Sequence, residues 1–181
     1  MNYVLIGMPG SGKSTLGVLL AKYLGFSFLD TDLVIQNKES KLLREIIEEK
    51  GTDGFLRIED DIGSSIHVDR TVIATGGSMV MGEAAMKNYR ENGKIIYLSI
   101  PFEEMERRLA NEYRRRGVVL LEGQTLWDMY DARCRLYEKY ADVTIAEQNL
   151  SLEETLQKVL EEIILFTDKQ KPEMMDYCRI G

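Results

Sequence analysis

The sequence predicts an α/β fold in which a five-stranded parallel sheet is covered by helices on both faces. Short apolar runs alternate along the chain with longer segments whose apolar residues recur at helical spacing. A glycine-rich turn joins the first apolar run to the first helical segment, as in a strand-turn-helix unit. With 181 residues, of which 44% are hydrophobic and 29% charged, the chain can bury the core of one domain. We therefore expect a single three-layer sandwich with right-handed crossovers.

Each element of this fold has its own signal. Strands are expected where apolar residues run together, at residues 3–6, 27–29, 71–74, 95–98 and 143–145. Helices are expected where apolar residues recur every three or four positions, at residues 16–24, 42–47, 52–68, 101–113, 126–140 and 152–163. Gly25 and Gly51 end the first two helical patterns, and Pro101 opens the fourth. The domain is predicted to cover residues 1–165, followed by a polar tail at 166–181.

Composition and charge limit the classes of partner. The formal net charge is -7, which argues against nucleic-acid binding because such binding needs many cations facing the phosphates. No apolar run is long enough for a membrane span, and no basic segment precedes a long apolar region, so we expect a cytoplasmic protein. The two cysteines, Cys134 and Cys178, lack metal-type spacing and are expected to be free thiols. A monomer that binds a small molecule is the working hypothesis.

The glycine-rich turn, Gly7 to Ser14, matches the P-loop pattern G-x-x-x-x-G-K-[ST] at every fixed position. Its glycines allow the backbone to wrap a polyphosphate, with the N–H groups and the following helix N-terminus turned toward the negative charge. Lys13 is expected to reach the β and γ phosphates, and the Ser14 hydroxyl to bind Mg²⁺. The predicted fold is therefore of the P-loop NTPase type, with ATP as ligand. The predicted nucleotide contacts here are Gly10, Ser11, Gly12, Lys13, Ser14 and Thr15.

Further candidate residues follow the second and third strands and the fourth helix. Asp30 and Asp32 emerge where the second strand ends, the end of a parallel strand that faces the ligand. The Gly76-Gly77 pair follows the third strand and suits either a close backbone approach to a ligand or a plain tight turn. The arginines at 114–116 lie in a predicted mobile lid at about 109–124, although a solvated charge run would look the same.

Two other nucleotide-binding classes fit less well. The segment 37–40 resembles the guanine-reading N-K-x-D, but Ser40 replaces its aspartate, and the D-x-x-G match at 60–63 lies inside a helical pattern. A dinucleotide-binding unit requires a third glycine where this chain has Thr15. A kinase that excludes water from the transferred phosphoryl group is the better hypothesis.

Together, these features resemble the shikimate kinase family over nearly the whole chain, to about residue 165. The shared parts are the loop at 7–15, the Asp30-Thr31-Asp32 element, Phe55 with Glu59, the Gly76-Gly77 turn, the arginine-rich lid, and residues 133–137 with 141–142. The loop alone is common to many ATPases, whereas this ordered set is much more specific.

The resemblance implies transfer of the ATP γ-phosphoryl group to the 3-hydroxyl of shikimate. It assigns phosphate and Mg²⁺ binding to Lys13 and Ser14, with Asp30 supporting the metal. It also assigns acceptor binding and proton acceptance to Asp32, backbone contacts to Gly76 and Gly77, and pairing with the substrate carboxylate to Arg133. Arg116 becomes the lid arginine, with Arg115 as its rival, and Arg107 or Arg108 lies near the adenine.

The chain departs from the family pattern on the acceptor side. The family places an arginine directly after the phenylalanine, as a second carboxylate ligand, where this chain has Leu56. Arg57 is the nearest replacement and a candidate substrate ligand, although neighbouring helical positions point about 100° apart. Ser78 occupies the position where the family has a third glycine, and Gly117 the position where it usually has a proline. Two alternatives therefore stay open: a kinase of another small hydroxylated metabolite (a sugar acid, polyol, amino alcohol or nucleoside monophosphate), and a non-catalytic ATP-binding module.

Overall fold

The computed structural model describes residues 1–110 and 118–169, and its centre is a parallel sheet of five strands. The strands are β1 (Asn2–Gly7), β2 (Ser27–Asp30), β3 (Thr71–Ala74), β4 (Gly93–Ser99) and β5 (Val143–Ala146). They lie in the order β2-β3-β1-β4-β5, and each neighbouring pair is parallel. The α/β class and the five predicted strands are confirmed. The phosphate loop follows β1, the central strand.

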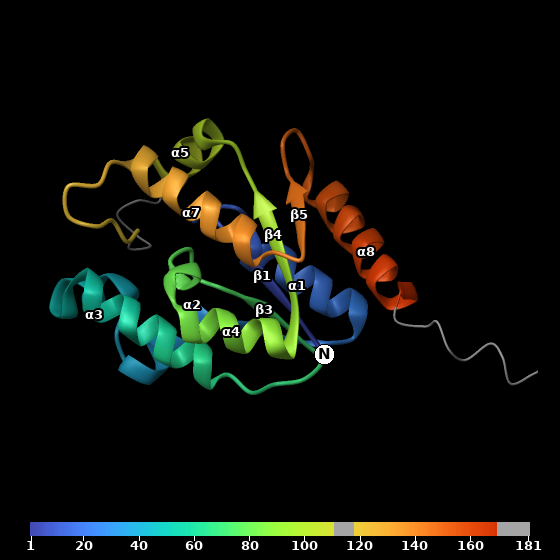
Figure 1. Cartoon of the computed structure of the whole chain (residues 1–181), viewed down its shortest axis with the longest axis horizontal. Helices are drawn as coiled ribbons and strands as arrows, with labels where there is room; N and C mark the ends of the chain where they lie inside the picture. The colour runs from blue at the N-terminus through green and yellow to red at the C-terminus, as the bar shows by residue number, and fades with distance from the viewer. Residues whose placement is uncertain (111–117, 170–181) are drawn as a thin grey trace, which may run out of the picture.

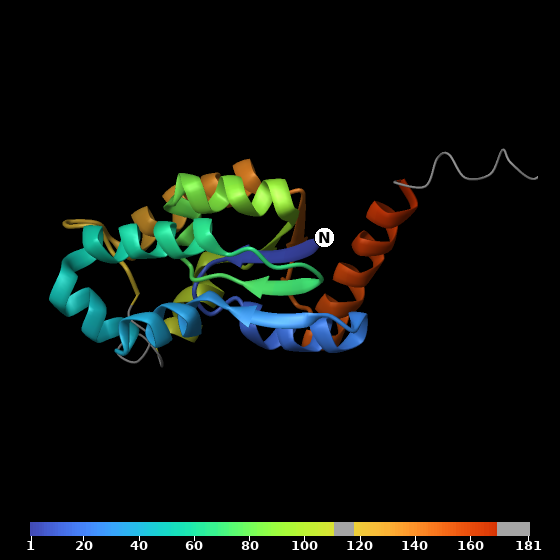
Figure 2. The same ribbon diagram turned by 90° about the horizontal axis from the view of Figure 1, so that it is seen from below.

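Helices connect these strands, as expected for a parallel sheet. They are α1 (Lys13–Leu24), α2 (Thr31–Glu39), α3 (Leu43–Ser65), α4 (Glu83–Asn92), α5 (Phe102–Ala110), α7 (Leu126–Tyr140) and α8 (Leu152–Lys169), with a short 3₁₀ helix η1 (Met79–Met81). Figure 1 shows α4 and α7 crossing one face of the sheet. Figure 2 shows α1 and α8 on the opposite face.

The core has two layers because β1 alternates its side chains between the faces of the sheet. Val4 and Ile6 are buried with residues of α4, α5 and α7, whereas Tyr3 and Leu5 are buried with residues of α1 and α8. A third, smaller cluster joins α2 to α3 and includes Phe55. This cluster holds α2 and α3 together beside the sheet (Figure 2). Residues of both helices line one pocket.

The predicted helices are confirmed where the apolar period is long, and the shorter ones were missed. Gly51 does separate two helical segments, because α3 bends there at a residue with φ 70° and ψ 174°. Helix α2 buries only Thr31 and Ile35, and begins at a cap in which the Asp30 carboxylate accepts the Asp32 N–H. Its apolar residues Leu33, Val34 and Ile35 are consecutive, so the segment shows no helical period. Helix α4, with ten residues, is also short and mostly polar, and the sequence did not predict it.

Two predicted boundaries change in the structure. Helix α8 continues to Lys169, beyond the predicted end at 163 and three residues past the predicted start of the tail. Helix α5 ends at Ala110 in the described part of the chain, so positions 111–113 of its predicted extension, the lid arginines at 114–116 and Cys178 lie outside the described residues. Cys134 is a free thiol, as predicted. Within residues 1–110 and 118–169, no helix combines the length and apolar character that crossing a membrane requires.

Candidate active site

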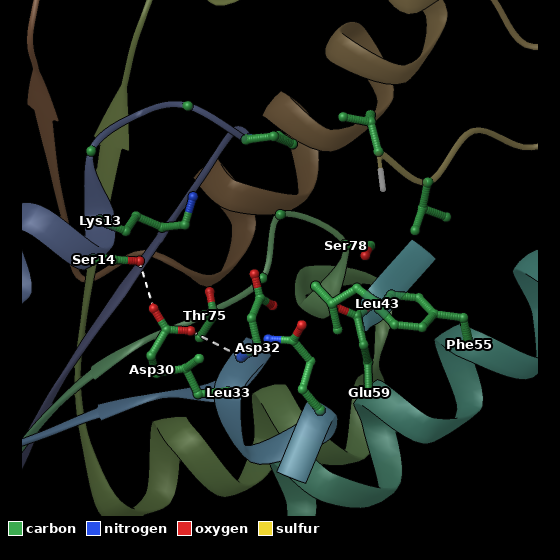
Figure 3. Close-up of a pocket in the computed structure, with 18 of the residues that line it drawn as sticks. Lys13, Ser14, Asp30, Asp32, Leu33, Leu43, Phe55, Glu59, Thr75 and Ser78 are labelled. Atoms are coloured by element: carbon green, nitrogen blue, oxygen red, sulfur yellow. Dashed lines mark hydrogen bonds between the residues drawn. The ribbon is translucent and has the colours of Figure 1, made fainter. Parts of the chain in front are cut away.

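A cavity of about 380 Å³ lies between the phosphate loop, α2, α3 and the turn after β3 (Figure 3). Most of the predicted site residues in the described part of the chain line it: Gly10, Gly12, Lys13, Ser14, Thr15, Asp30, Asp32, Gly76, Gly77 and Arg133. We call the part of the cavity built by the phosphate loop the donor half, and the part built by α2, α3, α7 and the turn after β3 the acceptor half, after the roles that the sequence predicts.

Lys13 is the centre of the donor half and is only 7% exposed. Its ammonium group donates to the carbonyl oxygens of Gly7 and Met8, both at 2.8 Å, and to the Ser11 hydroxyl at 3.3 Å. Gly10 permits this wrapped loop because its φ is 80°, a conformation that residues with a side chain rarely adopt. The loop thus curves around the lysine at the start of α1, where the helix N-terminus favours an anion.

Ser14 and Asp30 form the candidate Mg²⁺ site. The Ser14 hydroxyl donates to one oxygen of the Asp30 carboxylate at 2.6 Å, and the other oxygen accepts the Asp32 N–H at 3.0 Å (Figure 3). A hydroxyl and a carboxylate side by side are the hard oxygen ligands that Mg²⁺ prefers, so the residues present fit the ion. The described residues contain no cluster of three histidine, cysteine or acidic side chains that could hold a metal.

Asp32 and Glu59 meet at Gly76 in the acceptor half. A Cβ atom at Gly76 would lie 2.7 Å from Oδ1 of Asp32 and 2.6 Å from Oε1 of Glu59, so the two carboxyl groups flank this glycine. The Gly76 N–H already donates to the Thr31 hydroxyl at 3.0 Å, and the Gly77 carbonyl accepts the Tyr137 hydroxyl at 2.6 Å. The Gly76 N–H, which was predicted to contact a ligand, is thus bonded to Thr31 instead. The absence of a side chain at Gly76 leaves room for the carboxyl groups of Asp32 and Glu59.

Glu59 is a buried carboxyl group to which the sequence assigned no role. Its side chain is 2% exposed, and burial raises its pKa to about 8, with a further contribution from the nearby charge of Asp32. A hydrogen bond from Ser78 and the positive charge of Arg133 each lower this pKa, but by less than burial raises it. The motif Phe55 to Glu59 indicated the segment, but only the packing of α2 against α3 shows that this carboxyl enters the cavity.

Arg133 supplies positive charge to the acceptor half from α7. Its side chain is 4% exposed, and its guanidinium donates to the Val119 carbonyl at 2.6 Å. Val118 and Val119, from the predicted lid, also line the cavity. Sequence reasoning gave neither valine a role, since their place depends on how residues 118–121 cross the opening between α3 and α7.

Arg57 is not where the sequence placed it. Its side chain is exposed on α3 and does not line the cavity, so the prediction that it binds substrate is not supported. The reason is the helical rotation: Phe55 and Glu59 share the buried face of α3, and Arg57, two residues from each, lies on the other side. Leu56 is half-buried and packs against the cluster between α2 and α3.

The two arginines of α5 have different positions. Arg108 donates to the Gly10 carbonyl at 2.9 Å and to Glu104 at 2.6 Å, so it braces the phosphate loop from outside the cavity. Arg107 is exposed and paired with Glu104 at 2.7 Å. An adenine contact by either arginine stays a prediction, as does the lid role of Arg115 or Arg116, both of which lie outside the described residues.

Replacing Gly76 with alanine is expected to damage acceptor binding selectively. The new methyl group would meet the mobile ends of the Asp32 and Glu59 side chains, so these carboxyl groups must move while the backbone keeps its path. We expect the KM for the acceptor to rise about tenfold or more, with the KM for ATP changed by less than about threefold. Initial-rate measurements at varied acceptor and varied ATP would show this.

Gly77→Ala provides the contrast, because a Cβ there would lie 2.7 Å from the Pro9 ring in the phosphate loop. That substitution is expected to raise the KM for ATP. Equal effects of the two substitutions on both KM values would contradict the division of the cavity into donor and acceptor halves.

Comparison with known proteins shows which family the chain belongs to. The family model described as "Shikimate kinase" matches residues 9–164. The chain belongs to the shikimate kinase family. It is similar to a shikimate kinase of Nostoc punctiforme, at 36% identity over 91% of both chains, and to one of Clostridium botulinum, at 35% identity over 88% of this chain and 94% of the relative. The resemblance stated from the motifs is thus confirmed.

Solved structures of shikimate kinases have the same fold. The enzyme from Acinetobacter baumannii, solved in complex with shikimate, aligns with a TM-score of 0.77, 29% identity and 95% coverage of both chains. The enzyme from Aquifex aeolicus aligns with a TM-score of 0.73 and 27% identity, covering 92% of this chain and 98% of that chain. The predicted P-loop sandwich is therefore the fold of this shikimate kinase family member.

Proposed function

We propose that the protein is an ATP-dependent kinase that transfers the γ-phosphoryl group to the 3-hydroxyl of shikimate, a step in chorismate and aromatic amino-acid biosynthesis. One observation carries this proposal: a single cavity joins Lys13 of the phosphate loop to Asp32 and Arg133. A module that only bound ATP would have no need of a half-buried carboxylate and a buried arginine opposite the loop. Membership of the shikimate kinase family supports shikimate as the acceptor.

On the donor side, the chain contributes charge and position. The Lys13 ammonium, held at the loop carbonyls, can turn to the β and γ phosphates because its stem is flexible and its donors rotate. The N–H groups of the loop and the start of α1 add fixed positive ends. Mg²⁺, when bound at Ser14 and Asp30, supplies positive charge to the phosphate oxygens. Catalysis then consists mainly of orientation and charge stabilisation.

On the acceptor side, Asp32 accepts the proton of the attacking hydroxyl. The hydroxyl oxygen forms a bond to the γ-phosphorus, the bond from that phosphorus to the β–γ bridging oxygen breaks, and ADP leaves. Arg133 pairs with the acceptor carboxylate and so fixes which hydroxyl faces the phosphate loop. Val118 and Val119 present apolar surface to the cavity, which helps to exclude water from the transferred group.

A coupled assay of ADP release tests the proposal over a panel of acceptors. The panel contains shikimate, gluconate, a polyol, an amino alcohol, a nucleoside monophosphate and no acceptor. Shikimate is expected to give saturable turnover far above the rate without acceptor. Saturation by another alcohol, with shikimate no better than water, would contradict the proposal, and Leu56 is the residue that makes this second candidate function worth testing.

Three finer predictions belong to the same proposal. Mg²⁺ dependence follows from the oxygen ligands of Ser14 and Asp30, and is tested by loss of ADP release on chelation and recovery on adding the ion. A monomeric state and a cytoplasmic location, without nucleic-acid or membrane partners, stay predictions from the sequence. Sedimentation of the purified chain tests the first of these.

A further inference from the structure

Glu59 is the feature of the acceptor half that the proposed chemistry leaves unused. Its side chain is 2% exposed and lines the cavity, and its Oε2 atom has no hydrogen-bond partner among the described residues. Figure 3 shows Asp32 and Glu59 extending from α2 and α3 into the same part of the pocket. A buried carboxyl oxygen without a partner is costly unless a ligand satisfies it, so Oε2 points to a contact with the acceptor.

The charges around Glu59 decide which form of the group can serve there. Asp32 faces it from α2, Arg133 and Tyr137 face it from α7, and Tyr89 faces it from α4. Burial holds the pKa of both tyrosines well above the ordinary value, so they contribute no charge at neutral pH. Asp32 and Glu59, both ionised, would place two negative charges beside Arg133, the one cation that the described residues contribute to the acceptor half. Such a pocket would repel an acidic acceptor.

A protonated Glu59 removes this conflict. Among the described residues that line the cavity, the cations are Lys13, which lies at the phosphate loop, and Arg133. Leu56 and the exposed Arg57 add no second cation to the acceptor half. A carboxylic acid O–H at Glu59 can donate a hydrogen bond where an ionised carboxylate could only accept one.

We propose that Glu59 holds its proton in the acceptor pocket, and that its Oε2–H together with Arg133 binds the carboxylate of the acceptor. The inference rests on the proposed function, and adds to it a second ligand of the acceptor carboxylate. It also makes Glu59 a specificity residue: an acceptor with an ionised acid group gains a charge-assisted hydrogen bond, and a neutral one gains less.

The raised pKa of Glu59, about 8, is consistent with this protonated form at neutral pH. Above that pH the group ionises and turns from donor to repelling charge. Acceptor binding is therefore expected to weaken as the pH rises through the alkaline range. The affinity for ATP is not expected to change with the ionisation of Glu59.

The test is the KM for shikimate from pH 6 to pH 9.5, in wild-type and Glu59→Gln protein, with saturating ATP and Mg²⁺. Wild-type KM is expected to rise about tenfold or more across the range, because one group titrates within it. Glu59→Gln donates a hydrogen bond at every pH and cannot ionise, so its KM is expected to change by less than about threefold. Glu59→Leu removes the donor and is expected to raise KM about tenfold or more at all pH values.

Matched controls separate this effect from general effects of pH. Glu48→Gln changes an exposed glutamate on the same helix and is expected to reproduce the wild-type profile. The carboxamide analogue of shikimate has no negative charge, so its KM is expected to lose the alkaline rise. Coincident profiles of wild-type and Glu59→Gln protein, with normal turnover of shikimate, would overturn the inference and leave the proposed function intact. A wild-type KM that falls with rising pH would also overturn it.

A second measurement tests the proton on Glu59 without using turnover. The raised pKa means that folded protein keeps a proton that unfolded protein loses above about pH 4.5, so stability falls as pH rises from there to about 8. Glu59→Gln lacks this loss. Its Tm, relative to wild type, is expected to increase by several degrees between pH 5 and pH 8, and a constant difference would show that Glu59 is ionised in the folded protein and overturn the inference.

Discussion

Replacing Lys13 with alanine is expected to lower kcat by about a thousandfold or more while the chain remains folded. The lysine is the cation of the phosphate loop in the donor half, and its ammonium already lies at the loop carbonyls of Gly7 and Met8. Removing one preorganised donor from a transition state of developing charge costs about a hundred- to a thousandfold, and this donor carries a full charge. Single-turnover rates of phosphoryl transfer at saturating ATP would measure the loss.

Lys22→Ala provides the matched control for this prediction. Lys22 lies in the last turn of the same helix, α1, and is exposed. Its replacement is expected to leave kcat within about twofold, as for an ordinary surface substitution. Retention of most activity by Lys13→Ala would overturn the assignment of the donor site, provided that circular dichroism shows both variants folded.

Asp32→Asn is expected to lower kcat by about a hundred- to ten-thousandfold, with a much smaller effect on the KM for ATP. The amide keeps the shape of the side chain beside Gly76 but cannot accept a proton, and general-base catalysis contributes a factor of this size. The same change removes a negative charge from the neighbourhood of Glu59, which is expected to lower the pKa of that group. The measurement is kcat and both KM values at a fixed pH.

Asp61→Asn serves as the control for Asp32, because Asp61 is an exposed carboxylate on α3. It is expected to leave kcat within about twofold. A kcat for Asp32→Asn within fivefold of wild type would remove Asp32 from the role of proton acceptor, and would indicate that the proton leaves to water or phosphate instead.

The donor half could be predicted from the sequence because its residues are neighbours in the chain. Gly10, Lys13 and Ser14 occupy one turn, so their spacing already determines which groups can reach a phosphate. The place of Asp30 was predictable for a related reason: it ends a short strand, and the ends of parallel strands meet at one edge of the sheet. These predictions needed only local geometry and the direction of the sheet.

The acceptor half could be predicted only in part, because its residues come from four separate elements. Arg133 was assigned by resemblance, and the structure places it in the cavity. Arg57 was assigned as the nearest cation to Leu56, but the packing of Phe55 and Glu59 turns that position to solvent. Short α2, whose first turn carries Asp32, gave no periodic signal. Which face of α3 is buried, and hence where Arg57 lies, depends on tertiary packing that the linear pattern does not show.

By itself, the sequence determined the α/β class, the phosphate loop and the place of the polyphosphate site, because a strand, a glycine-rich turn and a helix specify these locally. Only the tertiary structure decided which groups of the acceptor half lie together and how deeply each is buried. Burial between α2, α3 and α7 brings the Glu59 carboxyl beside Asp32 and Arg133, and burial, which has no counterpart in the linear pattern, sets the pKa of that group. Spacing along a chain can specify which groups are present, whereas their protonation depends on what surrounds them.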